Sequence, residues 1–353
     1  KKEERRGRNF NSSDEIFLEE IKGQASAKRA LEIAAAGGHN ILFTGPPGTG
    51  KTMLAKTLKT LLPPLSFTEA LEVANIHSIA GSTASTITST SGSDSVSFFR
   101  ERPFRSPHHT SSYVSLIGGS ANPKPGEMTL AHHGVLFLDE FPEFDRRVIE
   151  ALREPLEEHR VSISRIRGNI IFPAYFILVA AMNPCPCGWR SSTNKKCICS
   201  AKDRLRYSKK ISGPILDRID LRVEVGDVDF EKIRDRGEKI TTETRARSET
   251  TTETGTETEI ARRKILAART RQFERQAKIN AYISGKDLPT LAPIEKNAED
   301  KLIESGIKLG FSMRAFHRIW RVARTIADLD EEKLIKERHV LEALQFRGGE
   351  DGG

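Results

Sequence analysis

The chain has 353 residues, of which 37% are hydrophobic and 29% are charged, and its formal net charge is +8. This composition is typical of a soluble globular protein, and no run of about 18 apolar residues is present, which excludes a membrane protein. The excess of positive charge favours a polyanionic partner but says nothing about the fold.

Residues 1–13 are mostly charged or polar and predict a linker that continues from a longer protein. They contain neither an initiator Met nor the apolar core of a signal peptide. Four cysteines in a chain without a leader indicate a reducing compartment, which we expect to be the cytoplasm.

Short β-branched apolar runs alternate with helical patterns over residues 14–229. The runs expected to form strands are residues 40–44, 134–138, 176–181 and 221–225. Such alternation is typical of a parallel sheet flanked by helices, so we expect residues 14–229 to form an α/β domain.

A tract rich in Thr and Glu occupies residues 241–259 and holds too few apolar side chains to repay the entropy of ordering them. We therefore expect residues 230–259 to be a flexible linker. Helical periodicity returns beyond it, so residues 260–353 predict a small helical domain. The expected helices are residues 260–280, 295–305, 312–327 and 337–344.

Residues 45–52 match the phosphate-binding pattern G-x-x-x-x-G-K-[ST], and they lie between a predicted strand and a predicted helix. Backbone N–H groups of such a loop cradle the phosphates of ATP, while Lys51 reaches the outer phosphates and Thr52 holds Mg²⁺. The predicted cofactors are therefore ATP and Mg²⁺. The nucleotide-binding residues are Gly45, Pro46, Pro47, Gly48, Thr49, Gly50, Lys51 and Thr52.

Two acidic residues, Asp139 and Glu140, follow the apolar run over residues 134–138. Because parallel sheets bind ligands at the carboxyl ends of their strands, we expect both to be catalytic. Asp139 would coordinate Mg²⁺ through its hydration shell, and Glu140 would polarise the attacking water. Asn183 follows another predicted strand and could orient the same water, or it could form an ordinary Asn-Pro turn.

Five longer motifs carry a resemblance to a known family. They are residues 102–109 (RPFRSPHH), 125–132 (PGEMTLAH), 151–156 (ALREPL), 182–188 (MNPCPCG) and 212–220 (SGPILDRID). With these motifs the chain resembles the ComM/YifB family of AAA+ ATPases, in a wider group that includes magnesium-chelatase I subunits and MCM helicases. Members of the family usually carry an N-terminal Lon-like domain, which this sequence does not contain.

The resemblance implies an AAA+ P-loop domain with a C-terminal helical lid, assembled as a homo-hexameric ring whose ATP sites lie between subunits. For the ComM branch it implies a DNA branch-migration helicase acting in recombination and natural transformation. Carried over by position, Asn183 matches sensor 1, Arg218 matches the arginine finger and Arg314 matches the sensor 2 residue.

The two arginines have alternative interpretations. Arg218 would neutralise charge on the phosphoryl group transferred in the next subunit, or it could form an ion pair with Asp217 or Asp220. Arg314 follows Ser312, a candidate N-cap, and would project from the first turn of a lid helix toward the nucleotide. A solvated arginine would give the same local pattern.

Residues 82–126 resemble an insertion in the second helix of this group, which points at the ring axis. The basic stretch inside it contains Arg102 and Arg105, which we expect to contact DNA. Arginines at a ring axis would meet phosphates without reading bases.

Residues 160–173 alternate apolar and polar positions around an Arg-Gly turn, which predicts a hairpin with Arg165 and Arg167 near its tip. In the resembled group this hairpin precedes the sensor 1 strand and contacts the substrate. Ordinary surface arginines on a solvated hairpin remain the alternative.

The four cysteines form two Cys-x-Cys pairs in a loop over residues 185–199. Four thiolates could close a structural Zn²⁺ site, or all four could be reduced and packed thiols. The candidate zinc ligands are Cys185, Cys187, Cys197 and Cys199.

The leading hypothesis is a hexameric motor in which ATP hydrolysis moves single-stranded or branched DNA. The alternative is a chelatase-like or chaperone motor that remodels a protein partner. A scaffold that binds ATP without turnover is a third possibility, and the intact set Lys51, Asp139, Glu140 and Arg218 argues against it.

Overall fold

The computed structural model describes residues 15–81, 101–119, 124–165, 168–227 and 255–347. The predicted linker over residues 1–13, most of the linker over residues 230–259, and Arg167 lie outside the described residues. Arg165 is described by its backbone alone.

A five-stranded parallel sheet forms the centre of the molecule, with the strand order β2-β5-β8-β1-β9. Its strands are β1 (Ile41–Thr44), β2 (Phe104–Arg105), β5 (Gly134–Leu138), β8 (Phe176–Met182) and β9 (Leu221–Glu224). The predicted α/β fold is confirmed, and each of the four predicted apolar runs forms a strand. The edge strand β2 is an addition that the sequence pattern did not predict.

Alternate side chains of the inner strands enter two separate cores. Along β1, Ile41 and Phe43 belong to one buried cluster while Leu42 belongs to the other. The same alternation continues along β5 and β8. Because successive strand residues point to opposite faces and both faces are covered, these strands need continuous apolar sequence.

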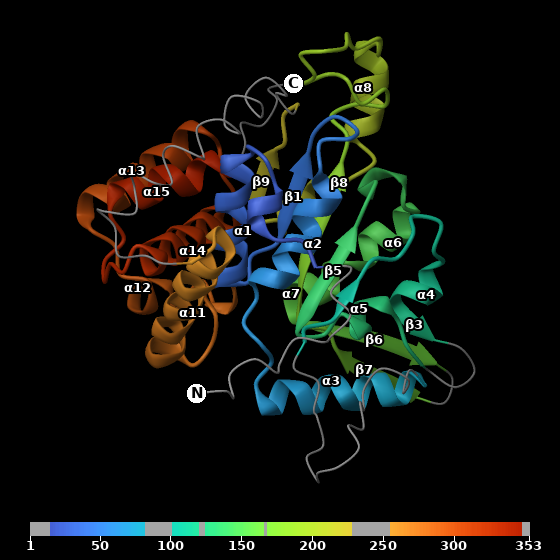
Figure 1. Ribbon diagram of the computed structural model, residues 1–353, viewed down its shortest axis with the longest axis horizontal. Coiled ribbons are helices and arrows are strands. Elements are labelled where there is room, and N and C mark those ends of the chain that lie inside the picture. The colour runs from blue at the N-terminus through green and yellow to red at the C-terminus, as the bar shows by residue number, and fades with distance from the viewer. Residues whose placement is uncertain (1–14, 82–100, 120–123, 166–167, 228–254, 348–353) are drawn as a thin grey trace, which may run out of the picture.

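Helices cover both faces of the sheet (Figure 1). The first face packs against α1 (Ala25–Gly37) and α2 (Lys51–Leu61). The second face packs against shorter helices, namely α4 (Tyr113–Ile117), α5 (Glu127–Leu130), α6 (Arg146–Ala151) and α7 (Arg153–Glu158).

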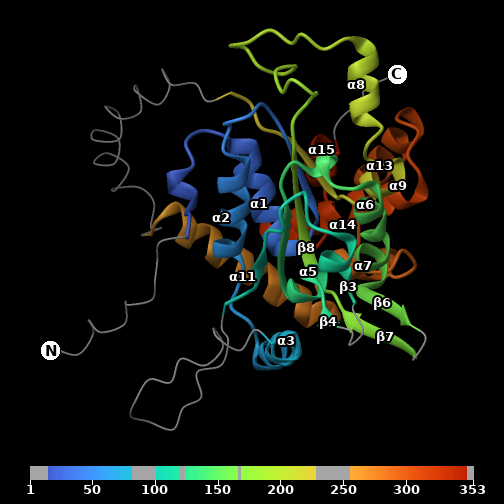
Figure 2. The ribbon, with the colours of Figure 1, turned by 90° about the vertical axis from the view of Figure 1, so that its right-hand side faces the viewer.

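The α/β part contains several further elements. They are α3 (Phe67–Ala80), α8 (Ala201–Ser208), α9 (Gly213–Leu216), the paired strands β3 (Gly118–Gly119) and β4 (Lys124–Pro125), the hairpin β6 (Arg160–Arg165) and β7 (Gly168–Pro173), and the 3₁₀ turns η1 (Leu18–Glu20) and η3 (Phe141–Glu143). Both views place α8 beyond the carboxyl ends of the strands and α3 beyond their amino ends (Figures 1 and 2).

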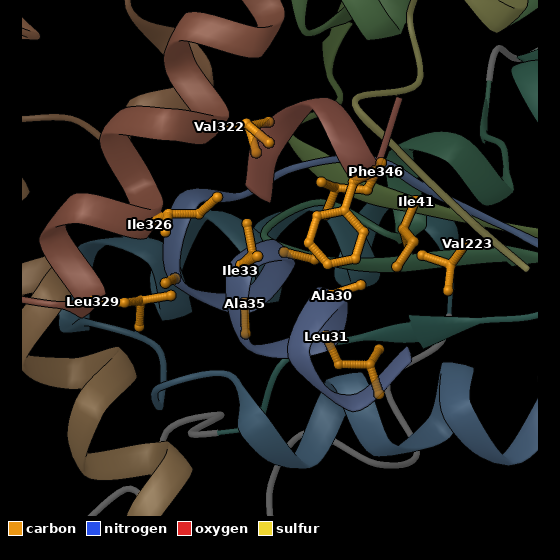
Figure 3. Packing of buried hydrophobic residues seen from close by; sticks show 14 of the residues in the cluster. Ala30, Leu31, Ile33, Ala35, Ile41, Val223, Val322, Ile326, Leu329 and Phe346 are labelled. Carbon is orange, nitrogen blue, oxygen red and sulfur yellow. The ribbon is translucent and has the colours of Figure 1, made fainter. Parts of the chain in front are cut away.

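The C-terminal part is helical, as predicted. It contains α11 (Glu257–Gln276), η4 (Asn280–Tyr282), α12 (Leu288–Leu291), α13 (Lys296–Lys308), α14 (Met313–Leu329) and α15 (Glu337–Gln345). Helix α1 packs against α11 and α14, so one hydrophobic cluster runs from the sheet into the helical part. Figure 3 shows Ile326 and Leu329 of α14 together with Ile33 of α1 in this cluster.

The boundaries of α11 differ from the prediction. The helix begins at Glu257 instead of residue 260, because Thr256 and Glu259 form a capping box inside the Thr/Glu tract. It ends at Gln276 instead of residue 280, because Ala277 adopts a left-handed conformation with φ of 54°. The end of the predicted linker is therefore part of an ordered helix.

None of the helices in the described residues is both long and apolar enough to cross a bilayer.

Candidate nucleotide site

The phosphate-binding loop connects the carboxyl end of β1 to the start of α2. Gly50 takes a left-handed conformation with φ of 86° at the N-cap of α2, which favours glycine at this position. Gly45 is fixed by space instead, because a Cβ atom there would lie 2.1 Å from the carbonyl oxygen of Val225 beside β9. The loop can therefore present backbone N–H groups at the amino end of a helix, where phosphate binds well.

Lys51 folds back over this loop. Its Nζ donates to the carbonyl oxygens of Gly45 and Pro46, each at 2.7 Å, and to Oδ1 of Asn183 at 3.3 Å. Burial lowers the pKa of Lys51 below its ordinary value, while the negative charge of Asp139 opposes this shift. The structure thus brings the predicted phosphate-binding lysine and the predicted sensor 1 asparagine into contact.

Thr52 and Asp139 meet at the next position of the site. The hydroxyl of Thr52 donates to Oδ2 of Asp139 at 3.0 Å, and the backbone N–H of Glu140 donates to Oδ1 of Asp139 at 2.9 Å. A hydroxyl and a carboxylate at the mouth of a phosphate loop are oxygen ligands of the kind that Mg²⁺ prefers. Thr52 and Asp139 therefore fit the Mg²⁺ ion that the sequence predicted.

Glu140 occupies a strained position. Its φ is 50°, in the left-handed region that non-glycine residues rarely adopt. Its carboxylate contacts the ring of His109, with Oε2 2.9 Å from Nδ1. Sequence reasoning missed His109, because the contact joins two segments 31 positions apart; its only signal was its place in the motif over residues 102–109.

Arg102 and Arg105 are each held by an acidic residue of the same chain. The Arg102 side chain is only 8% exposed, and it donates to the carbonyl oxygens of Pro63 and His133 and pairs with Glu69. Arg105 is held by Glu127 through two hydrogen bonds of 2.6 and 2.7 Å. Both guanidinium groups are used within the chain, and the contact of these arginines with DNA stays a prediction.

Arg218 and Arg314 share one carboxylate. Arg218 is 7% exposed at its side chain, and its Nη2 lies 2.7 Å from Oε2 of Glu157. Arg314 is 67% exposed, and its Nη1 lies 3.5 Å from Oε1 of the same residue. Burial raises the pKa of Glu157, but the hydrogen bond and charge of Arg218 outweigh it and hold the pKa below its usual range. The alternative partners considered for Arg218 pair elsewhere, Asp217 with Arg347 and Asp220 with Arg318.

Both arginines lie at the amino ends of the strands, whereas the phosphate loop lies at the carboxyl ends. The side-chain amide of Asn40, just before β1, donates to the carbonyl oxygen of Arg218 at 3.2 Å. The four residues of β1 then separate this end of the sheet from the loop by about 13 Å. Arg314 follows its N-cap Ser312 as predicted, but it does not project toward the nucleotide site of its own chain.

The four cysteines converge above the phosphate loop. Sγ of Cys185 lies 3.4 Å from that of Cys187 and 3.7 Å from that of Cys197, and all four sulfur atoms lie within 4.8 Å of one another. Tetrahedral Zn–S bonds of about 2.3 Å would place neighbouring sulfurs at close to these separations. The residues present therefore fit a Cys₄ zinc site. Gly188, one position after the second cysteine, lies so near Pro47 that a Cβ would approach its ring to 2.8 Å.

A second cluster of possible metal ligands consists of Glu72, His132 and His133. The backbone N–H of Tyr175 donates to Nδ1 of His132 at 3.1 Å, so the ring proton lies on Nε2, which faces Glu72 at 3.1 Å. Burial lowers the pKa of His132 to about 4, which keeps this ring neutral. Because Nε2 has no free lone pair in this tautomer, the cluster is a hydrogen-bond network and not a metal site.

The predicted hairpin forms, with Arg165 paired in register with Gly168. Arg165 is the last described residue of β6, and Arg167 lies outside the described residues.

Comparison with known proteins identifies related sequences over most of the chain. Residues 17–233 match the family model described as magnesium chelatase, subunit ChlI, and residues 255–347 match the ChlI C-terminal model. The competence protein ComM of Haemophilus influenzae is 44% identical over 96% of this chain and 61% of its own length. YifB of Escherichia coli is also 44% identical, over 94% of this chain and 60% of its own length. The chain thus spans about three fifths of the curated relatives it matches.

Proposed function

The chain belongs to the family of the magnesium-chelatase ChlI subunit, and from this premise we propose that it is the ATP-hydrolysing motor of a hexameric ring that moves DNA strands. Membership of this AAA+ family implies ATPase activity. The observation that carries the proposal is the position of the predicted catalytic residues: some lie at the carboxyl ends of the strands of the sheet, and the others lie at the amino ends.

At the carboxyl edge, we propose that Lys51 exchanges its contacts with Gly45 and Pro46 for the outer phosphates of ATP. The paired oxygens of Thr52 and Asp139 would hold Mg²⁺, which when bound neutralises charge on the phosphates. Glu140 would polarise the attacking water. The contact between Lys51 and Asn183 supports a role for this amide beside the outer phosphate.

At the amino ends of the strands, Arg218 and Arg314 are separated from the phosphate loop of their own chain by the length of β1, about 13 Å. Neither can complete the site of its own chain in this arrangement. We propose that each acts on ATP bound by the next subunit, because a head-to-tail ring brings the carboxyl edge of one copy against the amino edge of another. An arginine delivered in this way accelerates phosphoryl transfer by about 10³ to 10⁵.

We propose a structural Zn²⁺ in the loop over residues 185–199. The sulfur separations support it, and so does the choice of ligands, because four thiolates gathered without a cation would repel one another. The contact of Gly188 with Pro47 implies that an ordered cysteine loop braces the phosphate loop.

The DNA substrate rests on less direct support: the net charge of +8, the hairpin carrying Arg165 and Arg167, and the competence protein among the relatives. The alternative is a chelatase-like motor that remodels a protein partner, because the family model that matches is that of a magnesium-chelatase subunit.

The test is ATPase activity with and without branched, single-stranded and duplex DNA, for the unmodified chain and for Arg165→Ala combined with Arg167→Ala. We expect DNA to stimulate hydrolysis in the unmodified chain. The double variant should keep basal hydrolysis, lose stimulation, and lower the salt slope of DNA binding by about one unit per lost contact. DNA affinity and stimulation that are unchanged in the double variant would refute the role of the hairpin, and a chain that no DNA stimulates would favour the protein-remodelling alternative.

A further inference from the structure

A cavity lies at the amino ends of the strands, between the α/β part and the helical part. Its volume is about 370 Å³, within the range of small-molecule sites. The α/β part contributes Glu69, Arg102 and His133, and the helical part contributes Arg269, Phe273 and Tyr282. It begins at the first residues of β5 and β8, so it is distinct from the nucleotide site at the other ends of these strands.

The acidic groups of this cavity already have partners. Glu69 accepts from the guanidinium group of Arg102 at 3.2 Å, and Oε1 of Glu69 lies 3.6 Å from Nδ1 of His133. Glu72 accepts from His133 at 2.7 Å. The cavity therefore offers no free carboxylate that would favour a cationic ligand.

Unlike these acidic groups, the guanidinium group of Arg269 is only partly paired. Its side chain comes from α11 and is buried, with the whole residue only 8% exposed. Nε donates to the carbonyl oxygen of Ala35 at 2.9 Å, which caps the end of α1. Among the described residues, its two terminal nitrogens have no hydrogen-bond partner although they border the cavity. Burial and the nearby charge of Arg102 lower the pKa of Arg269 to about 9, so the group is still mostly protonated at neutral pH.

The two terminal nitrogens are not among the fully buried polar atoms without a partner, so they reach accessible space, where water or a ligand can accept from them. Arg102 does not supply an acceptor, because it is itself a cation and is matched by Glu69. An anion bound in the cavity would provide acceptors for both terminal nitrogens of Arg269 at once, in the planar geometry that favours carboxylate and phosphate.

Aromatic rings line the rest of the cavity. Tyr175 is 38% exposed and Phe273 is 51% exposed, which is high for rings of this size beside a core. The Tyr175 ring stacks on His159 with centroids 4.8 Å apart, and Tyr282 meets Tyr175 edge to face at 5.6 Å. The His133 ring also stacks on Tyr175, with centroids 6.1 Å apart, so the surroundings fix the tyrosine ring while part of it stays exposed.

We propose that this cavity is a binding site for a small planar aromatic molecule that carries one carboxylate or phosphate group. The anionic group binds Arg269, and the ring lies against Phe273 and Tyr175. The walls come from both parts of the chain, so the bound ligand joins the helical part to the sheet. It does so at the end of the strands opposite the ATP site.

The experiment is calorimetric titration of the chain with Mg²⁺ and saturating ADP present, so that the phosphate loop is occupied. The probes are 4-hydroxybenzoate, phenyl phosphate and, as the neutral counterpart, 4-hydroxybenzamide. We expect one anionic probe to bind per chain, and the preference between the first two probes identifies the anionic group. The neutral probe should bind at least about tenfold more weakly, the loss expected for a hydrogen bond to a charged group.

Two variants and a control complete the test. Arg269→Gln should weaken the anionic probe about tenfold or more. Phe273→Ala should weaken both the anionic and the neutral probes. Arg263→Gln, an exposed position on the same helix, should change nothing. If Arg269→Gln fails to fold because the cap of α1 is lost, Phe273→Ala carries the test, since this ring is half exposed.

Three results would overturn the proposal: no saturable binding up to about 1 mM of either anionic probe, equal affinity for the neutral probe, or unchanged affinity in folded Arg269→Gln and Phe273→Ala. The measurement does not depend on ATP hydrolysis or on DNA, so it is independent of the proposed motor function.

Discussion

Complementation between two inactive variants tests whether Arg218 acts on the next subunit. Arg218→Ala keeps Glu140 but loses the arginine, whereas Glu140→Gln keeps the arginine but loses the water-polarising carboxylate. Because the structure places these residues at opposite edges of the sheet, each variant alone should lose nearly all turnover, by about 10³ or more for the arginine. A mixed ring should regain activity wherever the intact halves meet.

The size of the recovery follows from the geometry of a head-to-tail ring. At equal amounts, half of the subunits supply an intact Glu140 and half of their neighbours supply an intact Arg218. About one quarter of the interfaces are then complete, so we expect about one quarter of the unmodified activity if the interfaces act independently. If Arg218 acted on the ATP of its own chain, no subunit would hold both residues and recovery would be zero.

The assay is steady-state ATP hydrolysis over a series of mixing ratios, with mixed rings verified by native mass spectrometry of subunits that differ in mass. The matched control mixes Glu140→Gln with Lys51→Ala, whose defects lie at the same edge and cannot complement. Replacing Arg218→Ala with Arg314→Ala should give the same recovery, because both arginines contact Glu157. Verified mixed rings without recovery at any ratio would refute the reasoning.

Three further predictions concern single sites. His109→Ala should lower kcat by about tenfold with KM for ATP unchanged, because the ring contacts Glu140 and no phosphate-loop residue; a change confined to KM would contradict this. Purified unmodified protein should contain about one zinc ion per chain, and Cys199→Ala should lose it. Unmodified protein that contains no zinc under reducing conditions would exclude the site. Burial opposes ionisation of Asp220, but the charge of Arg318 outweighs it and holds the pKa of this carboxyl below its usual range. Its stabilising effect is therefore present above the unfolded pKa and lost as the pH falls, so Asp220→Asn should cost about 3 kcal/mol at pH 7 and progressively less below about pH 4, as measured by urea unfolding.

Local sequence was sufficient for four of the five strands of the central sheet and for the nucleotide loop. The pattern over residues 45–52 encodes a turn, a helix start and a lysine within eight positions, so no distant contact is needed to recognise it. Asp139 and Glu140 were predicted as site residues because a buried strand in a parallel sheet ends where ligands bind, and the structure brings Asp139 into contact with Thr52. The start of α11 was missed for an equally local reason: the capping box of Thr256 and Glu259 lies in a tract of similar Thr and Glu residues, from which its sequence does not stand out.

Ion pairs between distant elements were not predictable from the sequence. Arg218 has an aspartate on each side, Asp217 immediately before it and Asp220 two positions on, yet its partner is Glu157, 61 positions earlier. The nearby aspartates are instead taken by Arg318 and Arg347 of the helical part. The packing of that part on the sheet decides these pairings, and a charge pattern along the sequence carries no record of it.

The sharing of Glu157 connects this packing to the proposed cycle. In the isolated chain one carboxylate partly neutralises two arginines, one from the α/β part and one from α14. The phosphates of a neighbour's ATP carry more negative charge than one carboxylate, so they should outcompete Glu157 for both guanidinium groups. Since Arg314 belongs to the helical part, binding of ATP at the interface would pull on that part as well as on Arg218. If these two arginines complete the catalytic site of a neighbour, as we propose, they would also transmit the nucleotide state of one subunit to the lid of the next.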